Sequence, residues 1–261
     1  MSIPYYQVDA FAEKAFAGNP AGICPLEEWL PDKMMQNIAM ENNLSETAFF
    51  VHEGECFHLR WFTPVLEVDL CGHATLAAAF VVFEQLNHPE PVIRFQTRSG
   101  ILSVEKDGND LMIDFPSRPP SKCDAPDGLL ESFNMKPDQV MRNERDYFLV
   151  FKTAAEIGAL KPDFGRLARV ECLGVITTAP GEGEVDFVSR FFAPSAGINE
   201  DPVTGSAHVC LTPYWADALG KKALLAHQIS RRGGVIRCEA NGDRVRISGK
   251  ARLFMTGEIV I

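Results

Sequence analysis

The sequence predicts an α+β protein made of two related halves. Arg-Trp-Phe-Thr-Pro at 60–64 is echoed about 130 residues later by Arg-Phe-Phe-Ala-Pro at 190–194. Behind each copy come a glycine-bearing turn and one mostly apolar, helix-length segment among strand-like runs. Solenoid repeats are only ~20–50 residues long, so a repeat of half the chain indicates two halves that face each other.

The first half reads as strands around one buried helix. A strand over 5–11 and a turn-rich stretch over 17–22 come first. Pro31-Asp32 opens a helix, because Pro suits a first turn, and Asn42-Asn43 ends it. Segment 74–86 is apolar on nearly every side, which is typical of a buried helix. The remaining predicted strands are 47–51, 57–62, 92–97, 101–105 and 111–115.

The second half repeats this plan after a proline-rich linker that begins at Pro116. A helix is expected over 207–219, closed by Gly220, and Pro213 should kink it or delay its start. Strands are predicted at 146–151, 185–192, 235–239, 244–248 and 253–261. We place the domains at 1–116 and 121–252, with the strand near 253–261 returning to the first and the active site in the cleft.

Composition argues against two classes of partner. A net charge of −10 and a pI near 5.1 argue against nucleic acid and anionic membranes. The N-terminus has no signal-peptide pattern, and the longest apolar stretch is too short to span a bilayer, so we expect a cytoplasmic protein. The seven cysteines lack metal-ligand spacing, so no metal site is expected, and most should be buried small hydrophobes.

The two turns are the first candidates for binding. Gly72 and Gly205 each begin a predicted buried helix, where free N–H groups and the helix dipole favour an anion. Two such ends would hold a carboxylate without any Arg. The alternative for either glycine alone is close helix–strand packing.

Four acidic or basic residues are candidates for proton transfer. Glu46 precedes an apolar run, where burial would raise its pKa, although an exposed strand start is the simpler interpretation. His73 follows Gly72 and occupies nearly the same place as Ser206 in the second copy. Glu200 and Asp201 put two carboxylates beside the second turn, so repulsion could raise a pKa there; a capping or turn role competes for Asp201.

Cys71 is two residues from His73, a spacing that prevents a Cys–His dyad on one helix face. We therefore interpret Cys71 as structural, with acid–base or nucleophilic use as a minor alternative. Dinucleotide, nucleoside-triphosphate and metal-hydrolase motifs are absent from the sequence. What remains is cofactor-free proton transfer on a small anionic molecule.

Five ordered motifs resemble the phenazine biosynthesis-like, or PhzF, family. They are Asn-Pro-Ala-Gly at 19–22, Leu-Ser-Glu-Thr-Ala-Phe at 44–49, Arg-Trp-Phe-Thr-Pro at 60–64, Leu-Cys-Gly-His-Ala-Thr-Leu at 70–76 and Glu-Asp-Pro-Val-Thr-Gly-Ser-Ala-His at 200–208. The resemblance implies the diaminopimelate epimerase-like fold, in which two pseudo-symmetric domains each wrap a mostly antiparallel sheet around a central helix. It also implies a cofactor-independent isomerase, commonly homodimeric.

The same resemblance implies roles for particular residues. Glu46 matches the Glu that shuttles a proton between two carbons in the phenazine enzyme, and His73 and Asp201 fall at the other acid–base positions. Gly205 and Ser206 match the carboxylate-binding turn. The remaining substrate-binding positions are Asn19, Ser45 and Gly72. Diaminopimelate epimerases pair two thiols, and the second turn here offers none to pair with Cys71.

Three functions follow from these observations. The leading one is an isomerase in which Glu46 moves a proton on a small carboxylate-bearing substrate. The second is a binding protein that kept the fold and lost catalysis. The third is an amino-acid racemase or epimerase that uses Cys71 with a non-thiol partner such as Asp201.

Overall fold

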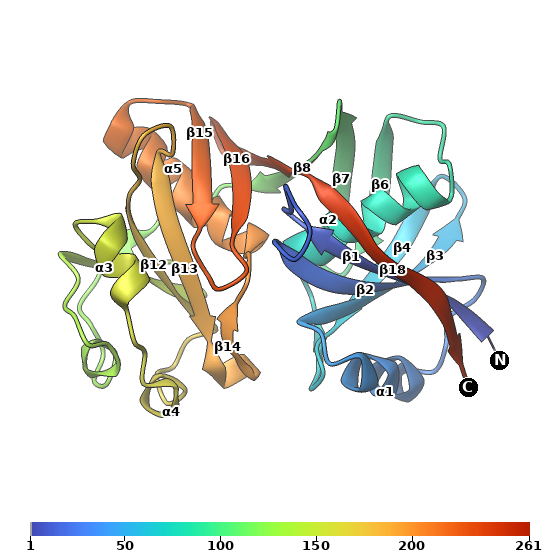
Figure 1. The fold of residues 1–261 in the computed structure, drawn as a ribbon, viewed down its shortest axis with the longest axis horizontal. Helices are drawn as coiled ribbons and strands as arrows, with labels where there is room; N and C mark the ends of the chain where they lie inside the picture. The colour runs from blue at the N-terminus through green and yellow to red at the C-terminus, as the bar shows by residue number, and fades with distance from the viewer. Residues whose placement is uncertain (1) are drawn as a thin grey trace. The chain divides into compact units, whose positions relative to one another are not determined.

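The computed structural model describes residues 2–261, which form two compact units (Figure 1). The first comprises residues up to Phe115 together with Ile247–Ile261, and the second comprises Pro116–Arg246. Few helices and many strands make both units α+β, as the sequence predicts. Within the described residues, no helix combines the length and apolarity needed to cross a membrane.

The first unit contains two α-helices and a set of mainly antiparallel strands. Its elements are β1 (Ser2–Ala10), β2 (Asn19–Leu26), α1 (Asp32–Asn42), β3 (Glu46–Glu53), β4 (Cys56–Phe62), β5 (Glu67–Val68), α2 (Gly72–Phe80) with a π-helical end at Val81–Gln85, β6 (Val92–Thr97), β7 (Gly100–Asp107), β8 (Asp110–Pro116) and β18 (Ala251–Val260).

Strand pairing in the first unit surrounds α2. β2 pairs with β3 in parallel and β3 with β4 antiparallel, while β4 pairs in parallel with β6. β1 lies between β2 and β18, antiparallel to both. All nine residues of α2 except Phe80 are buried, and the helix packs on β1, β2 and β3. An apolar helix covered on every side is what the pattern over 74–86 predicts.

Helix α1 begins and ends where its sequence signals predict. Pro31 is the N-cap, and Met35, Ile38 and Ala39 form the buried face. Asn43 adopts the left-handed conformation at the C-cap, and its N–H donates to the carbonyl of Ala39. Asn tolerates this conformation better than most residues, so the helix ends there.

The second unit has three α-helices. Its elements are β9 (Ser121–Lys122), a 3₁₀ turn (Leu130–Ser132), β10 (Gln139–Arg142), β11 (Asp146–Val150), α3 (Ala154–Ala159), α4 (Phe164–Leu167), β12 (Gly174–Pro180), β13 (Phe187–Ala193), a 3₁₀ turn (Pro194–Ala196), β14 (Ile198–Asp201), a 3₁₀ turn (Gly205–Ala207), α5 (His208–Leu219), β15 (Ala223–Gln228), β16 (Gly234–Asn241) and β17 (Arg244–Gly249), which runs into the first unit.

The second unit repeats the pairing order of the first. β11 pairs with β12 in parallel, β12 with β13 antiparallel, and β13 in parallel with β15. These match the β2–β3, β3–β4 and β4–β6 pairs, and the short strands β5 and β14 pair antiparallel with β4 and β13. The α5 helix packs on β15 and β16 (Figure 1). The repeat in the sequence is therefore a repeat of topology.

Pro213 lies inside α5 and does not delay its start, which is at His208. A proline cannot donate to the carbonyl four residues earlier, here that of Val209. The N–H of Arg118 donates to this carbonyl at 2.9 Å. The vacated acceptor is thus satisfied by the linker, which lowers the cost of a proline within the helix.

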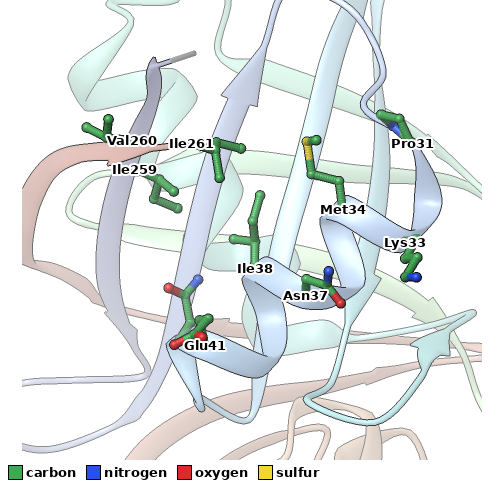
Figure 2. Close-up of a pocket in the computed structure, with 10 residues that line it drawn as sticks. Pro31, Lys33, Met34, Asn37, Ile38, Glu41, Ile259, Val260 and Ile261 are labelled. Atoms are coloured by element: carbon green, nitrogen blue, oxygen red, sulfur yellow. The ribbon is translucent and has the colours of Figure 1, made fainter.

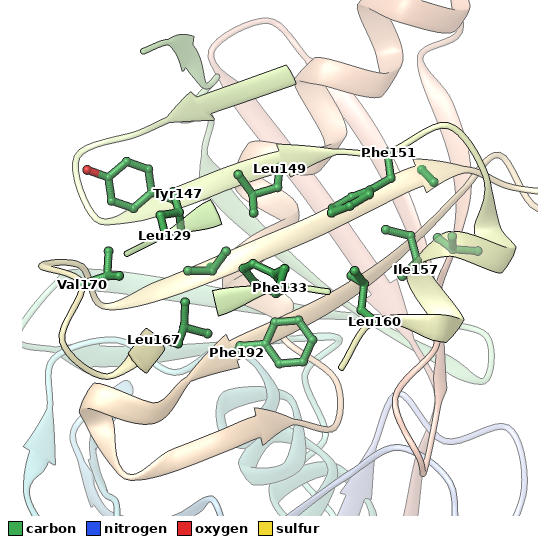
Figure 3. Packing of buried hydrophobic residues seen from close by; sticks show 13 residues of the cluster. Leu129, Phe133, Tyr147, Leu149, Phe151, Ile157, Leu160, Leu167, Val170 and Phe192 are labelled. Carbon is green, nitrogen blue, oxygen red and sulfur yellow. The ribbon is translucent and has the colours of Figure 1, made fainter. Parts of the chain in front are cut away.

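A continuous hydrophobic core supports the strands of the second unit (Figure 3). Leu149 on β11, Phe151 directly after β11 and Phe192 on β13 pack with Ile157 of α3. The ring of Phe133 lies 5.9 Å from that of Phe192. Each such side chain contributes about 1.5–3 kcal/mol when fully buried, so these strands form a rigid base for the turn that follows β14.

The turn-rich prediction for 17–22 is wrong for most of its length, since β2 begins at Asn19. Only the start is a turn, with Gly18 at φ 75°. Pro20 lies within β2 opposite Asp9 of β1. Pairing with β1 and β3 on both sides overrides the local preference of an Asn-Pro-Ala-Gly sequence, because tertiary contacts outweigh intrinsic propensity in strands.

Candidate active site

The first unit brings Glu46, Cys71 and His73 together. Glu46 is the first residue of β3, and His73 lies in the first turn of α2. His73 Nε2 is 3.1 Å from Glu46 Oε2, and His73 Nδ1 is 3.5 Å from Cys71 Sγ. All three are at most 9% exposed. Glu46 is therefore buried, not the exposed strand start that was the simpler interpretation.

The prediction that spacing prevents a Cys71–His73 pair is wrong. Cys71 is the N-cap of α2, with φ −143° and ψ 111°, so it lies outside the helix. The rule that i and i+2 residues diverge applies only to residues on one helix. From the extended N-cap position the thiol reaches the imidazole, while Thr75 N–H and Oγ1 both donate to the Cys71 carbonyl.

His73 is uncharged at neutral pH. Desolvation by burial lowers the pKa of His73 to about 3. A neutral imidazole has one N–H donor and one acceptor nitrogen. The Nδ1 contact with Cys71 falls within hydrogen-bond geometry, whereas the Nε2 contact with Glu46 Oε2 is close but is not aligned as a hydrogen bond. The arrangement suits proton transfer, because the atoms lie within direct reach of one another.

The three residues also contain metal-ligating atoms within 4.8 Å of one another. His73, however, turns Nδ1 to Cys71 and Nε2 to Glu46. The three side chains thus form a row of thiol, imidazole and carboxylate.

Asp201 lies in the second unit, at the end of β14, in a network that fixes its position. Thr204 Oγ1 donates to Asp201 Oδ2 at 2.5 Å. Gln228 Nε2 donates to the Asp201 carbonyl at 2.7 Å, and Gln228 Oε1 accepts from the Thr204 N–H at 2.7 Å. Asp201 is 6% exposed and Gln228 1%. Sequence reasoning missed Thr204 and Gln228, and nothing in the local sequence around Gln228 connects it to Asp201.

His208 also forms a hydrogen bond to the turn that contains Thr204. Its Nδ1 is 2.9 Å from the Thr204 carbonyl, to which it donates as Nδ1–H. Burial lowers the pKa of His208 to about 4. The imidazole is therefore neutral, and it anchors the turn between β14 and α5.

The turn at Gly205 and Ser206 has an arginine beside it. Arg145 Nη2 donates to Ser206 Oγ at 3.1 Å and to Asp146 Oδ2 at 2.7 Å. Burial raises the pKa of Asp146, and Arg145 opposes that rise. We expected the turn to favour an anion without any Arg; the guanidinium beside it is paired with the Asp146 carboxylate, so the helix start remains the group that favours an anion there.

Glu200 and Asp201 do not form the paired carboxylates that the sequence predicts. Neighbouring strand residues point to opposite faces. Glu200 accepts two hydrogen bonds from Arg190, at 2.6 and 2.9 Å, while Asp201 accepts from Thr204. The two carboxylates therefore bind different partners.

The repeated Arg residues have the same structural role in each unit. Arg60 binds both carboxylate oxygens of Glu67 on β5, and its guanidinium lies 5.2 Å from the Phe62 ring. Arg190 binds Glu200 on β14 and lies 4.9 Å from the Phe192 ring. The repeated motif is therefore a scaffold element that ties a central strand to the short strand before the turn.

The predicted substrate-binding positions of the first unit lie on or beside the elements that carry Glu46, Cys71 and His73. Gly72 is buried between Cys71 and His73 as the first residue of α2. Ser45 is half-buried and directly precedes β3. Asn19 is fully buried at the start of β2, two residues before Ala21, the register partner of Glu46.

A pocket lies away from these residues. It has a volume of about 510 Å³ and lies between α1 and the end of β18. Figure 2 shows Met34 and Ile38 projecting from α1 toward the segment that carries Ile259 and Ile261. It is lined largely by apolar side chains and contains none of the predicted catalytic residues.

The fold and the site together define a class of protein. It is an α+β protein of two repeated units with buried acid–base side chains, in the diaminopimelate epimerase-like fold. A crystal structure of a hydroxyproline epimerase from Agrobacterium vitis shares this fold, with a TM-score of 0.65 at 8% identity over 99% of this chain and 92% of that one. The profile of phenazine biosynthesis-like proteins matches residues 8–257. The chain belongs to this PhzF family, as the sequence motifs predict.

Full-length relatives support the family and its class of activity. A Pseudomonas aeruginosa protein named as an uncharacterized isomerase is 52% identical over 99% of both chains. A PhzF-family crystal structure from Enterococcus faecalis has a TM-score of 0.95 and 48% identity, with full coverage of both chains. The chain is an isomerase of this family.

Proposed function

We propose that the chain catalyses a cofactor-independent isomerisation in which Glu46 moves a proton between carbons of a small carboxylate-bearing metabolite. The single observation that carries this proposal is the contact of Glu46 with a neutral, buried His73 at 3.1 Å. A carboxylate in a dry site can remove a proton from carbon next to an activating group and return it elsewhere. His73 assists at Glu46, and Asp201 is the other assisting acid or base.

The carboxylate of the substrate binds in this proposal at the turn of Gly205 and Ser206, with Asn19, Ser45 and Gly72 as further binding positions. Arg145, which is paired with Asp146, donates to the Ser206 hydroxyl and holds it in place at this turn. The start of the helix favours negative charge.

Solvent-deuterium incorporation tests the proposal. Metabolite mixtures are incubated with the enzyme in D₂O, and mass spectrometry identifies the compound that gains deuterium and changes isomer. Glu46→Gln should abolish that incorporation, whereas Glu41→Gln, an exposed change on α1, should leave it intact. Unchanged exchange in Glu46→Gln would refute the role of Glu46.

The same assay separates the two alternatives. A binding protein would bind a metabolite without any exchange in the wild type. A racemase based on Cys71 and Asp201 would lose activity in Cys71→Ser and keep it in Glu46→Gln.

The proposal includes a cytoplasmic homodimer. The apolar side chains Leu253, Phe254 and Met255 are exposed on β18, which pairs with β1 along one edge. Long exposed apolar edge strands tend to pair with another chain. In an antiparallel pair of two copies centred on Met255, Arg252 of one copy lies opposite Glu258 of the other, so the strand is complementary to itself.

Sedimentation equilibrium tests this assembly. Phe254→Glu should shift the protein from dimer to monomer, because it places two like charges in the paired strands. Leu219→Glu, at an exposed apolar position at the end of α5, is the matched control and should remain dimeric. A monomeric wild type, or a dimer that survives Phe254→Glu, would contradict this interface.

A further inference from the structure

Cys71 contacts His73, and the proposed function gives this thiol no role. Its Sγ lies 3.5 Å from His73 Nδ1, and both side chains are buried. The hydrogen bonds from Thr75 to the Cys71 carbonyl hold the backbone at this N-cap. The thiol is therefore fixed on the opposite side of the imidazole from Glu46.

The position of the single imidazole proton decides whether His73 presents an N–H group or a lone pair to Glu46. With the proton on Nε2, the partial positive charge of the N–H group lies close to the Glu46 carboxylate, a favourable electrostatic contact although it is not aligned as a hydrogen bond. With the proton on Nδ1, a bare nitrogen faces a carboxylate oxygen at 3.1 Å, which places two acceptors against each other. A carboxylate that acts as a base therefore requires the Nε2–H form, and Nδ1 must then accept a hydrogen bond from another group.

The thiol of Cys71 can be that donor. The S–H group is a weak hydrogen-bond donor, and sulfur contacts at 3.5 Å are within its range. We propose that Cys71 is a positioning residue whose thiol donates to His73 Nδ1 and so keeps the imidazole proton on Nε2, against Glu46. The inference rests on the proposed function of Glu46.

The thiol contact decides which group the imidazole presents to Glu46: an N–H group and not a lone pair. Cys71 thus acts through His73 and does not touch the reacting atoms.

Nitrogen NMR of the resting enzyme tests the tautomer without any substrate. Histidine ring ¹⁵N shifts distinguish a protonated from an unprotonated nitrogen, and His73→Gln assigns the signals. Wild type and Cys71→Ser should both show Nε2–H, since a hydroxyl also donates, whereas Cys71→Ala should gain the Nδ1–H form. A wild type with Nδ1–H, or an unchanged tautomer in Cys71→Ala, would overturn the proposal.

Turnover adds a second measurement once a substrate is known. Cys71→Ala should lower kcat roughly two- to tenfold, the factor of one net hydrogen bond, with KM nearly unchanged. Cys71→Ser should recover most of the loss, and Cys56→Ala, at a half-buried free thiol on β4, should match wild type. Failure of Cys71→Ser to recover kcat would contradict the inference. The NMR result stands independently of whether Glu46→Gln abolishes exchange.

Discussion

At the scale of single residues, His73 and His208 are neutral because burial removes their charged form from water. The pKa of His73 is lowered to about 3 and that of His208 to about 4. Histidine in an unfolded chain has a pKa near ~6.5. Below that pH the unfolded chain therefore binds protons at these two histidines, whereas the folded chain does not. A lowered folded-state pKa thus gives stability that is present above ~6.5 and lost as the pH falls toward about 4.

We therefore predict that the free energy of unfolding falls by up to ~1.4 kcal/mol per pH unit for each of these histidines below pH ~6. His208→Asn should reduce this slope, because Asn can still donate to the Thr204 carbonyl and has no titration. Urea unfolding at a series of pH values measures it, with His52→Asn, at an exposed position, as the control. Parallel slopes for His208→Asn and wild type would contradict the prediction.

Residue types and spacing in the sequence indicated Glu46, His73 and Asp201 as candidates, and their catalytic roles stay predictions. The Cys71–His73 contact could not be predicted by helical spacing because Cys71 precedes the helix. The Thr204–Gln228 link joins a turn to the end of β15, and only the pairing of β13 with β15 places these residues together.

At the scale of elements, the long apolar helices and alternating strands were predictable because one periodic pattern covers each of them. The strands β2 and β12 could not be predicted in this way, because each includes glycine and proline and depends on pairing with strands on both sides. The tolerance of Pro213 depends on the Arg118 N–H, which no local pattern reveals.

The repeated Arg element gives a prediction at this scale. Arg190 donates to Glu200 and also to the carbonyls of Ile157 and Leu160 at the end of α3. A lysine cannot make these bonds together, so Arg190→Lys should lower the free energy of unfolding by about 1–3 kcal/mol. Denaturant unfolding measures the loss. Arg166→Lys, with an exposed side chain, is the control and should change little; equal effects would argue against the bracing role.

At the scale of the whole molecule, the two units share a topology and differ in chemistry. With Arg60 and Arg190 taken as equivalent, the strand registers place Glu46 and Gly174 at the same point of β3 and β12. The equivalent of Asp201 on β5 is a valine. Each unit therefore carries its carboxylate at a position where the other has none, and duplication of the fold has not duplicated the acid–base groups.

Packing enforces this asymmetry at Gly174. A Cβ there would lie 2.2 Å from Cζ of Phe191, a buried residue of the repeated motif. Gly174→Ala should therefore destabilise the protein by roughly 1–3 kcal/mol, the usual range for overpacking. Gly158→Ala in α3 is the matched control: its Cβ would meet nothing within 4 Å, and alanine should stabilise the helix by about 0.5–1 kcal/mol. Thermal unfolding of both variants measures the contrast. If Gly174→Ala were as stable as wild type, the Phe191 ring could move aside, and packing would not explain why the second unit lacks a counterpart of Glu46.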